Sequence, residues 1–260
     1  MLASLAPRAC DLKPAMHIVI PARYASSRLP GKPLLDVAGK PLIERVYERA
    51  RASGAASVTI ATDDERIRAA AEGFGARVVM TSASHRSGTE RIGEVLAHLG
   101  IGSGEIVVNL QGDEPLMPPA LLRQVAQALE SDPEAAVATA CHRLRHVDEF
   151  NNPNVVKVVR DARGRALYFS RAPIPFPRDG EGPAEAFRHI GLYAYRAGFV
   201  ARYCGWSPCP LESIEQLEQL RVLWHGETIS VVETAELPEA GVDTPEDLER
   251  VRRAYGNQRG

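Results

Sequence analysis

The sequence predicts an α/β protein with a doubly wound, mostly parallel sheet and a later antiparallel insertion. Two observations lead to this fold class. From residue 18 to residue 140, short apolar runs of strand length alternate with segments of helical periodicity. After residue 150, the pattern changes to closely spaced runs around a short turn, which is typical of antiparallel hairpins. The alternating part places helices on both faces of a parallel sheet.

The first half is expected to supply five strands with helices between them. The strands are bounded apolar runs, and the helices carry apolar residues three or four positions apart. We expect the strands at residues 18–20, 57–61, 77–80, 105–110 and 135–140. We expect the helices at residues 41–53, 62–72, 87–99 and 118–130.

The second half is expected to form an antiparallel insertion before the chain returns to the core. A hairpin is predicted from residues 155–160 and 166–169, around the turn Asp161-Ala162-Arg163-Gly164. Residues 189–195 alternate as a strand does, which places His189, Tyr193 and Tyr195 on one face. A helix over 211–225 has the apolar stripe Leu211, Ile214, Leu217, Leu220, Leu223 and Trp224. A strand at 228–233 and a helix at 245–255 follow.

Composition excludes several classes of function. The 260 residues are 45% hydrophobic and 25% charged, as in an ordinary globular domain. The net charge of −2 argues against a general nucleic-acid or anionic-membrane binder. The four cysteines are scattered without a C-x-x-C pair, which favours a reducing, cytoplasmic compartment over a disulfide framework or zinc site. No apolar run approaches the ~20 residues of a membrane-spanning helix, so we expect no membrane insertion.

Residues 1–15 are interpreted as a disordered extension or a start-site artefact. They contain one arginine and no apolar run of signal-peptide length, and Met16 stands directly before the first strand. We therefore expect one domain over residues 16–260.

A basic loop follows the first strand and is the first candidate for a binding site. It carries Arg23, Ser26, Arg28 and Lys32, and such guanidinium, hydroxyl and ammonium groups suit a polyphosphate. A Walker A loop is excluded, because Ser26 occupies the first glycine position and Pro33 replaces the hydroxyl residue after Lys32. The alternative is a solvated surface loop.

Two aspartates are candidates for a metal site. Asp113 ends an apolar strand, at the sheet edge where ligands of α/β proteins bind. Asp243 precedes Thr244, Pro245 and Asp247, which together satisfy a helix capping box without it. Because the helix does not need the Asp243 carboxylate, it is available as a ligand, although a solvated position is equally consistent. Together the two would bind a divalent cation.

Nine sequence motifs in order closely resemble the 3-deoxy-manno-octulosonate cytidylyltransferases, over residues 16–255. They are P-A-R-Y-A-S-S-R-L-P-G-K-P, A-T-D-D-E, H-R-S-G-T-E-R, V-N-L-Q-G-D-E-P, N-P-N-V-V-K-V-V, Y-F-S-R-A-P-I-P, H-I-G-L-Y-A-Y-R, L-E-Q-L-R-V-L-W and G-V-D-T-P-E-D-L-E-R-V-R. The resemblance implies a Rossmann-like nucleotidyltransferase fold and a magnesium-dependent enzyme. Its reaction would join CTP and 3-deoxy-D-manno-octulosonate (KDO) into CMP-KDO and pyrophosphate for lipopolysaccharide synthesis.

The resemblance also implies a role for each candidate residue. Those assigned to CTP are Ala22, Arg23, Ser26, Arg28, Lys32, Ser87, Arg91 and Gln111. Those assigned to KDO are Arg171, His189, Tyr193, Glu218 and Gln219. Asp113 and Asp243 would bind Mg²⁺ and, with Arg23 and Lys32, carry the catalysis. Residues from about 16 to 145 would bind CTP. Residues from about 146 to 235 would bind the sugar and form the interface of a homodimer, and residues 236–260 would return to the core.

Three alternatives stay open at this point. The substrate could be sialic acid or 8-amino-KDO on the same fold. The sugar-side motifs favour KDO, but they cannot reveal the exchange of one hydroxyl group for an amino group. The chain could also be a non-catalytic sugar-nucleotide-binding module, although binding alone would not require both aspartates. The segment 178–187 is short for the family, so a loop near the sugar is expected to differ.

Overall fold

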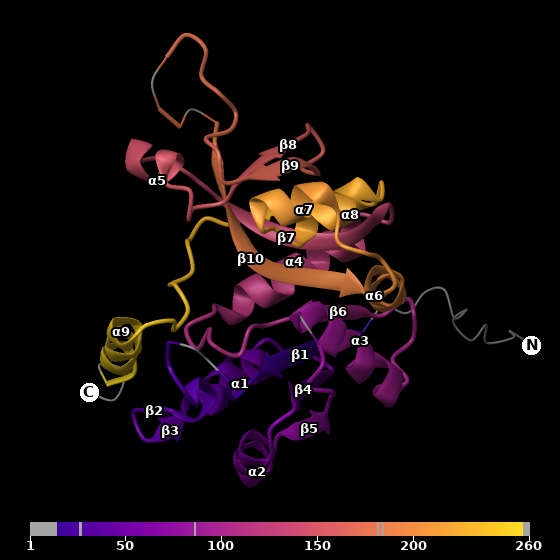
Figure 1. Cartoon of the computed structure of the whole chain (residues 1–260), viewed down its shortest axis with the longest axis vertical. Helices are drawn as coiled ribbons and strands as arrows, with labels where there is room; N and C mark the ends of the chain where they lie inside the picture. Colours follow the sequence, from indigo (N-terminus) through magenta and orange to yellow (C-terminus); the bar gives the residue numbers. More distant parts are fainter. Residues whose placement is uncertain (1–14, 26–27, 86, 181, 184, 257–260) are drawn as a thin grey trace, which may run out of the picture.

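The computed structural model describes residues 15–25, 28–85, 87–180, 182–183 and 185–256. Within them, the core is a nine-stranded sheet whose main path runs β11-β7-β10-β6-β1-β4-β5 (Figure 1). Strands β1 (Met16–Ala22), β4 (Ser57–Thr62), β5 (Arg77–Met80) and β6 (Ile106–Asn109) are mutually parallel. The predicted mostly parallel α/β sheet is therefore confirmed.

Helices cover both faces of this sheet, as expected for a doubly wound fold. The alternation along β1 divides the core, because Ile18 and Ile20 face one apolar cluster and Val19 faces the other. The first cluster includes buried residues of α1 (Leu42–Ala52), α2 (Glu65–Gly73) and α4 (Pro119–Ser131). The second includes those of α3 (Gly88–Leu99), α6 (Ala197–Cys204) and α8 (Gln219–Trp224).

The second half of the chain joins this same sheet. Strand β10 (Phe187–Arg196) lies between β6 and β7 (Ala135–Arg143) and is antiparallel to both. Strand β11 (Thr228–Glu233) extends the sheet parallel to β7. The expected hairpin is present as β8 (Lys157–Arg160) and β9 (Ala166–Ser170), and it pairs with β10. The described strands of residues 146–235 therefore belong to the same sheet, with β8 and β9 off its main path.

A small cluster attaches the end of the chain to its beginning. Helix α9 (Pro245–Gly256) packs near the ribbon of β2 (Asp36–Val37) and β3 (Lys40–Pro41), which follows the short η1 helix (Lys32–Leu34). Val37, Leu42, Val242 and Val251 are buried together there. The hydroxyl group of Tyr255 donates to the carbonyl oxygen of Pro115 at 2.7 Å. The C-terminal segment therefore packs against the loops that follow β1 and β6.

The prediction of one continuous helix over 211–225 is wrong. Two short helices are present, α7 (Pro210–Glu215) and α8 (Gln219–Trp224), and between them Gln216 has a left-handed backbone with φ 54°. The break rotates the apolar stripe, so Ile214 and Trp224 are exposed instead of buried. Helix α6 and the short α5 (Val147–Asn151) were not expected from the sequence.

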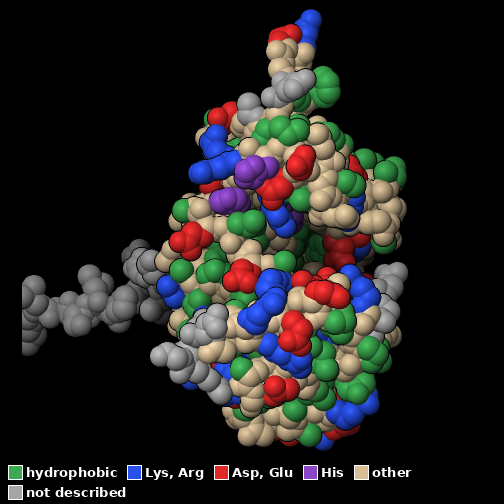
Figure 2. Space-filling view, turned by 90° about the vertical axis from the view of Figure 1, so that its left-hand side faces the viewer, with side chains coloured by type: hydrophobic (Ala, Val, Ile, Leu, Met, Phe, Trp, Pro, Cys, Tyr) green, Lys and Arg blue, Asp and Glu red, His purple; other side chains and the backbone are tan. Residues whose placement is uncertain are grey.

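The surface agrees with the small net charge of the chain. Figure 2 shows Lys and Arg side chains interspersed with Asp and Glu over one face, without a large area of one sign. No helix within the described residues is both long and apolar enough to span a membrane.

Candidate active site

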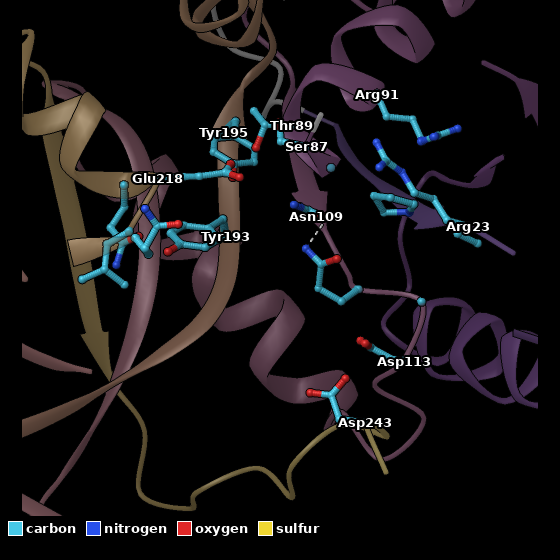
Figure 3. Close-up of a pocket in the computed structure, with 18 of the residues that line it drawn as sticks. Arg23, Ser87, Thr89, Arg91, Asn109, Asp113, Tyr193, Tyr195, Glu218 and Asp243 are labelled. Carbon is cyan, nitrogen blue, oxygen red and sulfur yellow. Dashed lines mark hydrogen bonds between the residues drawn. The ribbon is translucent and has the colours of Figure 1, made fainter. Parts of the chain in front are cut away.

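A cavity of about 670 Å³ opens at the carboxyl ends of β1 and β6 and extends to β10 and the α7–α8 turn. Its size suits a small-molecule site. Figure 3 shows its two walls: Arg23 and Arg91 lie on one side, and Tyr193, Tyr195 and Glu218 lie on the other. We call these the nucleotide-side wall (residues 21–25, 28–33, 87–91, 109–113 and 243) and the sugar-side wall (Val137, Tyr193, Tyr195, Tyr203, residues 216–219 and Val222). The names follow the roles that the motifs imply.

The structure brings twelve of the predicted site residues into this one cavity. They are Ala22, Arg23, Arg28, Lys32, Ser87, Arg91, Gln111, Asp113, Tyr193, Glu218, Gln219 and Asp243. Ser26 lies outside the described residues. Two further predicted residues, Arg171 and His189, do not line the cavity and are treated below.

Asp113 and Asp243 meet at the ammonium group of Lys32, although about 130 residues separate them in the chain. Lys32 Nζ lies 2.7 Å from Asp113 Oδ2 and 3.2 Å from Asp243 Oδ1, and it also donates to the carbonyl oxygen of Val242. The guanidinium group of Arg28 lies 3.2 Å from Asp243 Oδ1. Both carboxylates therefore contact the Lys32 ammonium group, and Asp243 also contacts Arg28. Figure 3 shows Asp113 and Asp243 on the same side of the cavity.

This donor set fits a hard divalent cation. Mg²⁺ commonly binds one or two protein carboxylates and completes its octahedron with water and substrate phosphate oxygens. Asp113 is about one-third exposed and Asp243 about half exposed at their side chains, so their oxygens remain accessible to such a shell. No group of three or more His, Cys, Asp or Glu side chains suited to a metal occurs among the residues the structure describes. A metal here would therefore need substrate oxygens as further ligands.

Close backbone contacts hold these acids in place. The Val242 N–H donates to the Asp113 carbonyl oxygen at 2.8 Å, and a Cβ atom on Gly241 would lie only 3.0 Å from that oxygen. A Cβ atom on Gly112 would lie 2.7 Å from the Pro21 carbonyl oxygen. The Asp243 side chain takes no part in the helix cap, as expected, because Thr244 and Asp247 form the reciprocal cap of α9. The Asp243 N–H donates to Asp247 Oδ2 at 3.1 Å.

Glu114 is a neighbouring acid that the sequence did not single out. Burial and the adjacent Asp113 carboxylate raise the pKa of Glu114 to about 8. The Glu114 carboxyl group therefore adds little negative charge to the centre at neutral pH.

The basic loop is shaped by a few contacts near Gly31. Gly31 has φ +67°, and its N–H donates to the Tyr24 carbonyl oxygen. The guanidinium group of Arg66 lies 3.3 Å from the centroid of the Tyr24 ring. Arg23 donates to the carbonyl oxygen of His85, which joins the loop to the segment before α3. These contacts hold the loop in place, and its cationic side chains Arg23, Arg28 and Lys32 line the cavity.

Helix α3 directs its N-terminus into the cavity, where the helix dipole favours an anion. Ser87 is the N-cap, and its hydroxyl group accepts from the Glu90 N–H at 3.2 Å. Arg91 is fully buried, bonds Thr81 and lies 3.0 Å from Asp63 Oδ2. Its Nε atom has no hydrogen-bond partner among the described residues. Arg91 therefore anchors the nucleotide-side wall and keeps one donor unused.

Tyr195 connects the two walls. Its hydroxyl group is hydrogen-bonded to Thr89 and Asn109, while burial raises the pKa of the phenol. Asn109 Oδ1 also accepts from Gln111 Nε2 at 3.4 Å, the contact drawn as a dashed line in Figure 3. A single polar chain thus runs from β10 through β6 to the loop that bears Asp113.

The sugar-side wall is aromatic and carries one acid. The rings of Tyr193 and Tyr195 are stacked with centroids 6.0 Å apart, and the Tyr203 hydroxyl group donates to the Glu218 carbonyl oxygen. The Glu218 carboxyl group points into the cavity beside Tyr195 (Figure 3). Desolvation there raises the pKa of Glu218, whereas Arg221 opposes this shift. Gln219 is buried, and its Nε2 atom has no partner.

His189 and Arg171 lie behind or beside this wall. His189 stacks within 5.5 Å of the Tyr193 ring, and its Nε2 atom lies 3.0 Å from Thr139 Oγ1. Burial lowers the pKa of His189 to about 3, so the ring is neutral. Arg171 donates to the carbonyl oxygens of Glu215 and Pro153. Neither side chain touches the cavity in this conformation, and their contact with the sugar stays a prediction.

Several lining residues were missed by the sequence analysis. They are Thr89, Asn109, Tyr195, Tyr203, Gln216 and Leu217. Some signals were available: Tyr195 shares the strand face of Tyr193, and Asn109 lies two positions before Gln111. No local signal identified Tyr203, because its helix α6 was not expected.

Fold and cavity together define an α/β enzyme of the nucleotide-binding class, with a two-carboxylate centre. The family model described as cytidylyltransferase matches residues 17–229. A 3-deoxy-manno-octulosonate cytidylyltransferase of Idiomarina loihiensis is 55% identical over 92% of this chain and 98% of its own length. One of Aliivibrio fischeri is 58% identical over 90% of this chain and 96% of its own. The chain therefore belongs to the 3-deoxy-manno-octulosonate cytidylyltransferase family, and it is a nucleotidyltransferase.

Solved structures agree with this assignment. A CMP:2-keto-3-deoxy-manno-octonic acid synthetase in complex with CTP has a TM-score of 0.87 and 45% identity, over 94% of this chain and 99% of that one. A nucleotidyl transferase from Methanothermobacter thermautotroptrophicus has a TM-score of 0.58 and 18% identity over the same share of this chain. The second likeness concerns the fold alone.

Proposed function

We propose that this enzyme transfers the cytidylyl group of CTP to the 2-hydroxyl group of KDO, giving CMP-KDO and pyrophosphate. One observation carries the proposal: Asp113, Asp243 and Lys32 converge at the junction of a basic wall and an aromatic wall. Relatives of 55–58% identity are named for this reaction, and a structural neighbour is described as complexed with CTP. These names support the choice of both substrates.

The nucleotide-side wall would bind the triphosphate. Arg23, Arg28 and Lys32 would contact its oxygens and stabilise the charge that develops on the departing pyrophosphate. The N-terminus of α3, at Gly88 and Thr89, would face the same anion. Ala22, Ser87, Arg91 and Gln111 would surround the nucleoside.

Asp113 and Asp243 would bind Mg²⁺ together with substrate oxygens. When bound, the ion would lower the pKa of the attacking hydroxyl group and screen the phosphate charge. The protein holds the two substrates on opposite walls, so that the hydroxyl oxygen attacks the α-phosphorus as the bond to the β-phosphate oxygen breaks. The hydroxyl proton passes to solvent, and no side chain forms a covalent intermediate.

The sugar-side wall would bind KDO. Tyr193, Glu218 and Gln219 offer donors and acceptors for its hydroxyl groups, and the buried Gln219 amide still has an unused donor. We also propose that the enzyme acts as a cytoplasmic homodimer that activates KDO for lipopolysaccharide synthesis, as its resemblance to the family implies.

Pyrophosphate release tests this proposal. We expect release with CTP, Mg²⁺ and KDO, and none with ATP, GTP or UTP or after addition of EDTA. Sialic acid and 8-amino-KDO are assayed in parallel. Faster release with either analogue would identify that analogue as the substrate in place of KDO. The proposed metal centre would be unaffected by this result. Release that persists in EDTA would contradict the proposed role of Asp113 and Asp243.

A further inference from the structure

The turn between α7 and α8 supplies four consecutive residues to the sugar-side wall. Gln216, Leu217, Glu218 and Gln219 all line the cavity. In a continuous helix, four consecutive side chains would point around the axis in different directions. The left-handed backbone at Gln216 ends α7 and allows these side chains to face the cavity. The shape of this turn therefore determines which groups reach a ligand.

A buried ion pair fixes this turn from behind. Glu212 of α7 is 8% exposed and Arg221 of α8 is 7% exposed. Arg221 Nε lies 2.7 Å from Glu212 Oε2, and Arg221 Nη2 lies 2.5 Å from Glu212 Oε1. Such two-pronged pairing constrains both the distance and the relative orientation of the groups. Neither Glu212 nor Arg221 lines the cavity.

Further contacts connect the pair to the surrounding wall. Arg221 Nη1 donates to the Trp206 carbonyl oxygen at 3.2 Å, and its guanidinium group lies 4.7 Å from the centroid of the Tyr203 ring. Glu212 Oε2 accepts from the Cys209 N–H and so fixes the start of α7. The Leu217 N–H donates to the Glu212 carbonyl oxygen. Helices α6, α7 and α8 are thus all connected to this pair.

A buried ion pair is a poor source of net stability, because the desolvation of both charges offsets their attraction. Apolar residues of similar volume often stabilise a protein equally well or better. A two-pronged pair adds a directional constraint on the relative orientation of two short helices, which apolar contacts supply less specifically. The pair lies beneath four lining residues. This location suggests that its function is to fix the relative orientation of α7 and α8.

We propose that Arg221 is a positioning residue, whose pairing with Glu212 sets the α7–α8 turn and thereby the affinity of the enzyme for its sugar acid but not for CTP. This inference rests on the proposed function, which places the sugar acid against this wall. Arg221 acts through Glu218 and Gln219 and does not itself touch the substrate.

The charge of Arg221 gives a second consequence. Desolvation, Glu212 and Glu90 raise the pKa of Glu218, and Arg221 lowers it. The other titratable groups on this wall are the tyrosines Tyr193, Tyr195 and Tyr203. Loss of the guanidinium charge therefore raises the pKa of Glu218 further. If the Glu218 carboxylate accepts from the sugar, the acidic limb of kcat/KM for the sugar moves to higher pH.

Steady-state kinetics of Arg221→Lys and Arg221→Met test the proposal. The lysine keeps the charge but loses the two-pronged geometry, and the methionine removes both. We expect the KM for KDO to rise about tenfold in Arg221→Lys and more in Arg221→Met, because sugar-side groups are misplaced. The KM for CTP should change less than twofold. Only Arg221→Met should also shift the acidic limb of kcat/KM for KDO upward.

Arg165→Lys is a matched control. Arg165 forms a similar two-pronged pair with Asp132, at 2.7 and 2.8 Å, but neither residue lines the cavity or borders the turn. This control should change neither KM. Equal changes of both KM values in Arg221→Lys, or a lower Tm with both KM values normal, would overturn the positioning role. Wild-type enzyme that releases no pyrophosphate from CTP and KDO would instead overturn the proposed function.

Discussion

The two walls of the cavity are built on different physical principles. The nucleotide-side wall consists of loops that follow parallel strands, with charged side chains fixed by close backbone contacts such as Val242 to Asp113. The sugar-side wall consists of an antiparallel strand and a helical turn, whose aromatic and amide side chains are fixed by burial and by the Glu212–Arg221 pair. A triphosphate can be recognised by charge alone, whereas a sugar requires directional hydrogen bonds from a shaped surface. Changes on the first wall should therefore reduce turnover, and changes on the second should mainly alter affinity.

The largest effect is expected at the charged centre. Asp113→Asn keeps the size of the side chain but removes one of the two carboxylates that face Lys32. We expect kcat to fall by a factor of about 1,000 or more, since metal-assisted charge stabilisation contributes several kcal/mol. Thermal unfolding should stay within a few degrees of wild type, because Asp113 is partly exposed. Turnover near the wild-type value would refute the proposed metal role.

A smaller effect is expected where backbone contact positions Asp243. Gly241→Ala places a methyl group 3.0 Å from the Asp113 carbonyl oxygen, so one of the two segments must move. We expect kcat to fall by about 10- to 100-fold, since small displacements of reacting groups have effects of this size. Gly73→Ala is the control, because its methyl group would meet no atom within 4 Å. A normal kcat in Gly241→Ala would contradict this expectation, because it would show that catalysis does not depend on the close contact between Gly241 and Asp113.

The connection between the walls is tested by Tyr195→Phe. This change removes the hydroxyl group that bonds Thr89 and Asn109 and leaves the ring stacking in place. We expect a loss of about 1 kcal/mol in the free energy of unfolding and severalfold lower kcat/KM for both substrates, because the polar chain reaches both walls. Tyr47→Phe, whose ring packs on Phe74 away from the cavity, should leave the kinetics unchanged. A change in kcat/KM for only one substrate would show that Tyr195 does not connect the two walls.

The smallest effect concerns pH and stability on the sugar side. Burial lowers the pKa of His189 to about 3, below its ordinary value near 6.5, so the unfolded state binds a proton more readily than the folded state. Stability from this group is complete above pH 6.5 and is lost as the pH falls toward 3. We expect a loss of about 1–2 kcal/mol between pH 7 and pH 5, measured by urea unfolding. His189→Gln should flatten this pH dependence, and an unchanged slope would refute the assignment.

The sequence alone determined the layered architecture and most of the nucleotide-side wall. Hydrophobic periodicity is local, so the strands near 57–61 and 77–80 and the helices between them were located within a few residues. Charged residues at strand ends stand out for the same reason, and Arg23, Lys32 and Asp113 all line the cavity. The capping box of α9 also explained why the Asp243 side chain is available.

Only the tertiary structure decided how the sugar-side wall is formed. The break at Gln216 lies between Glu212 and Arg221, which pair with each other, and the apolar stripe across 211–225 cannot reveal either feature. The insertion of β10 between β6 and β7 depends on pairing partners more than 40 residues distant, and it places Tyr195 beside Asn109. Periodicity reports which face of an element is apolar but not which element will cover it. For that physical reason the charged wall was predictable and the shaped wall was not.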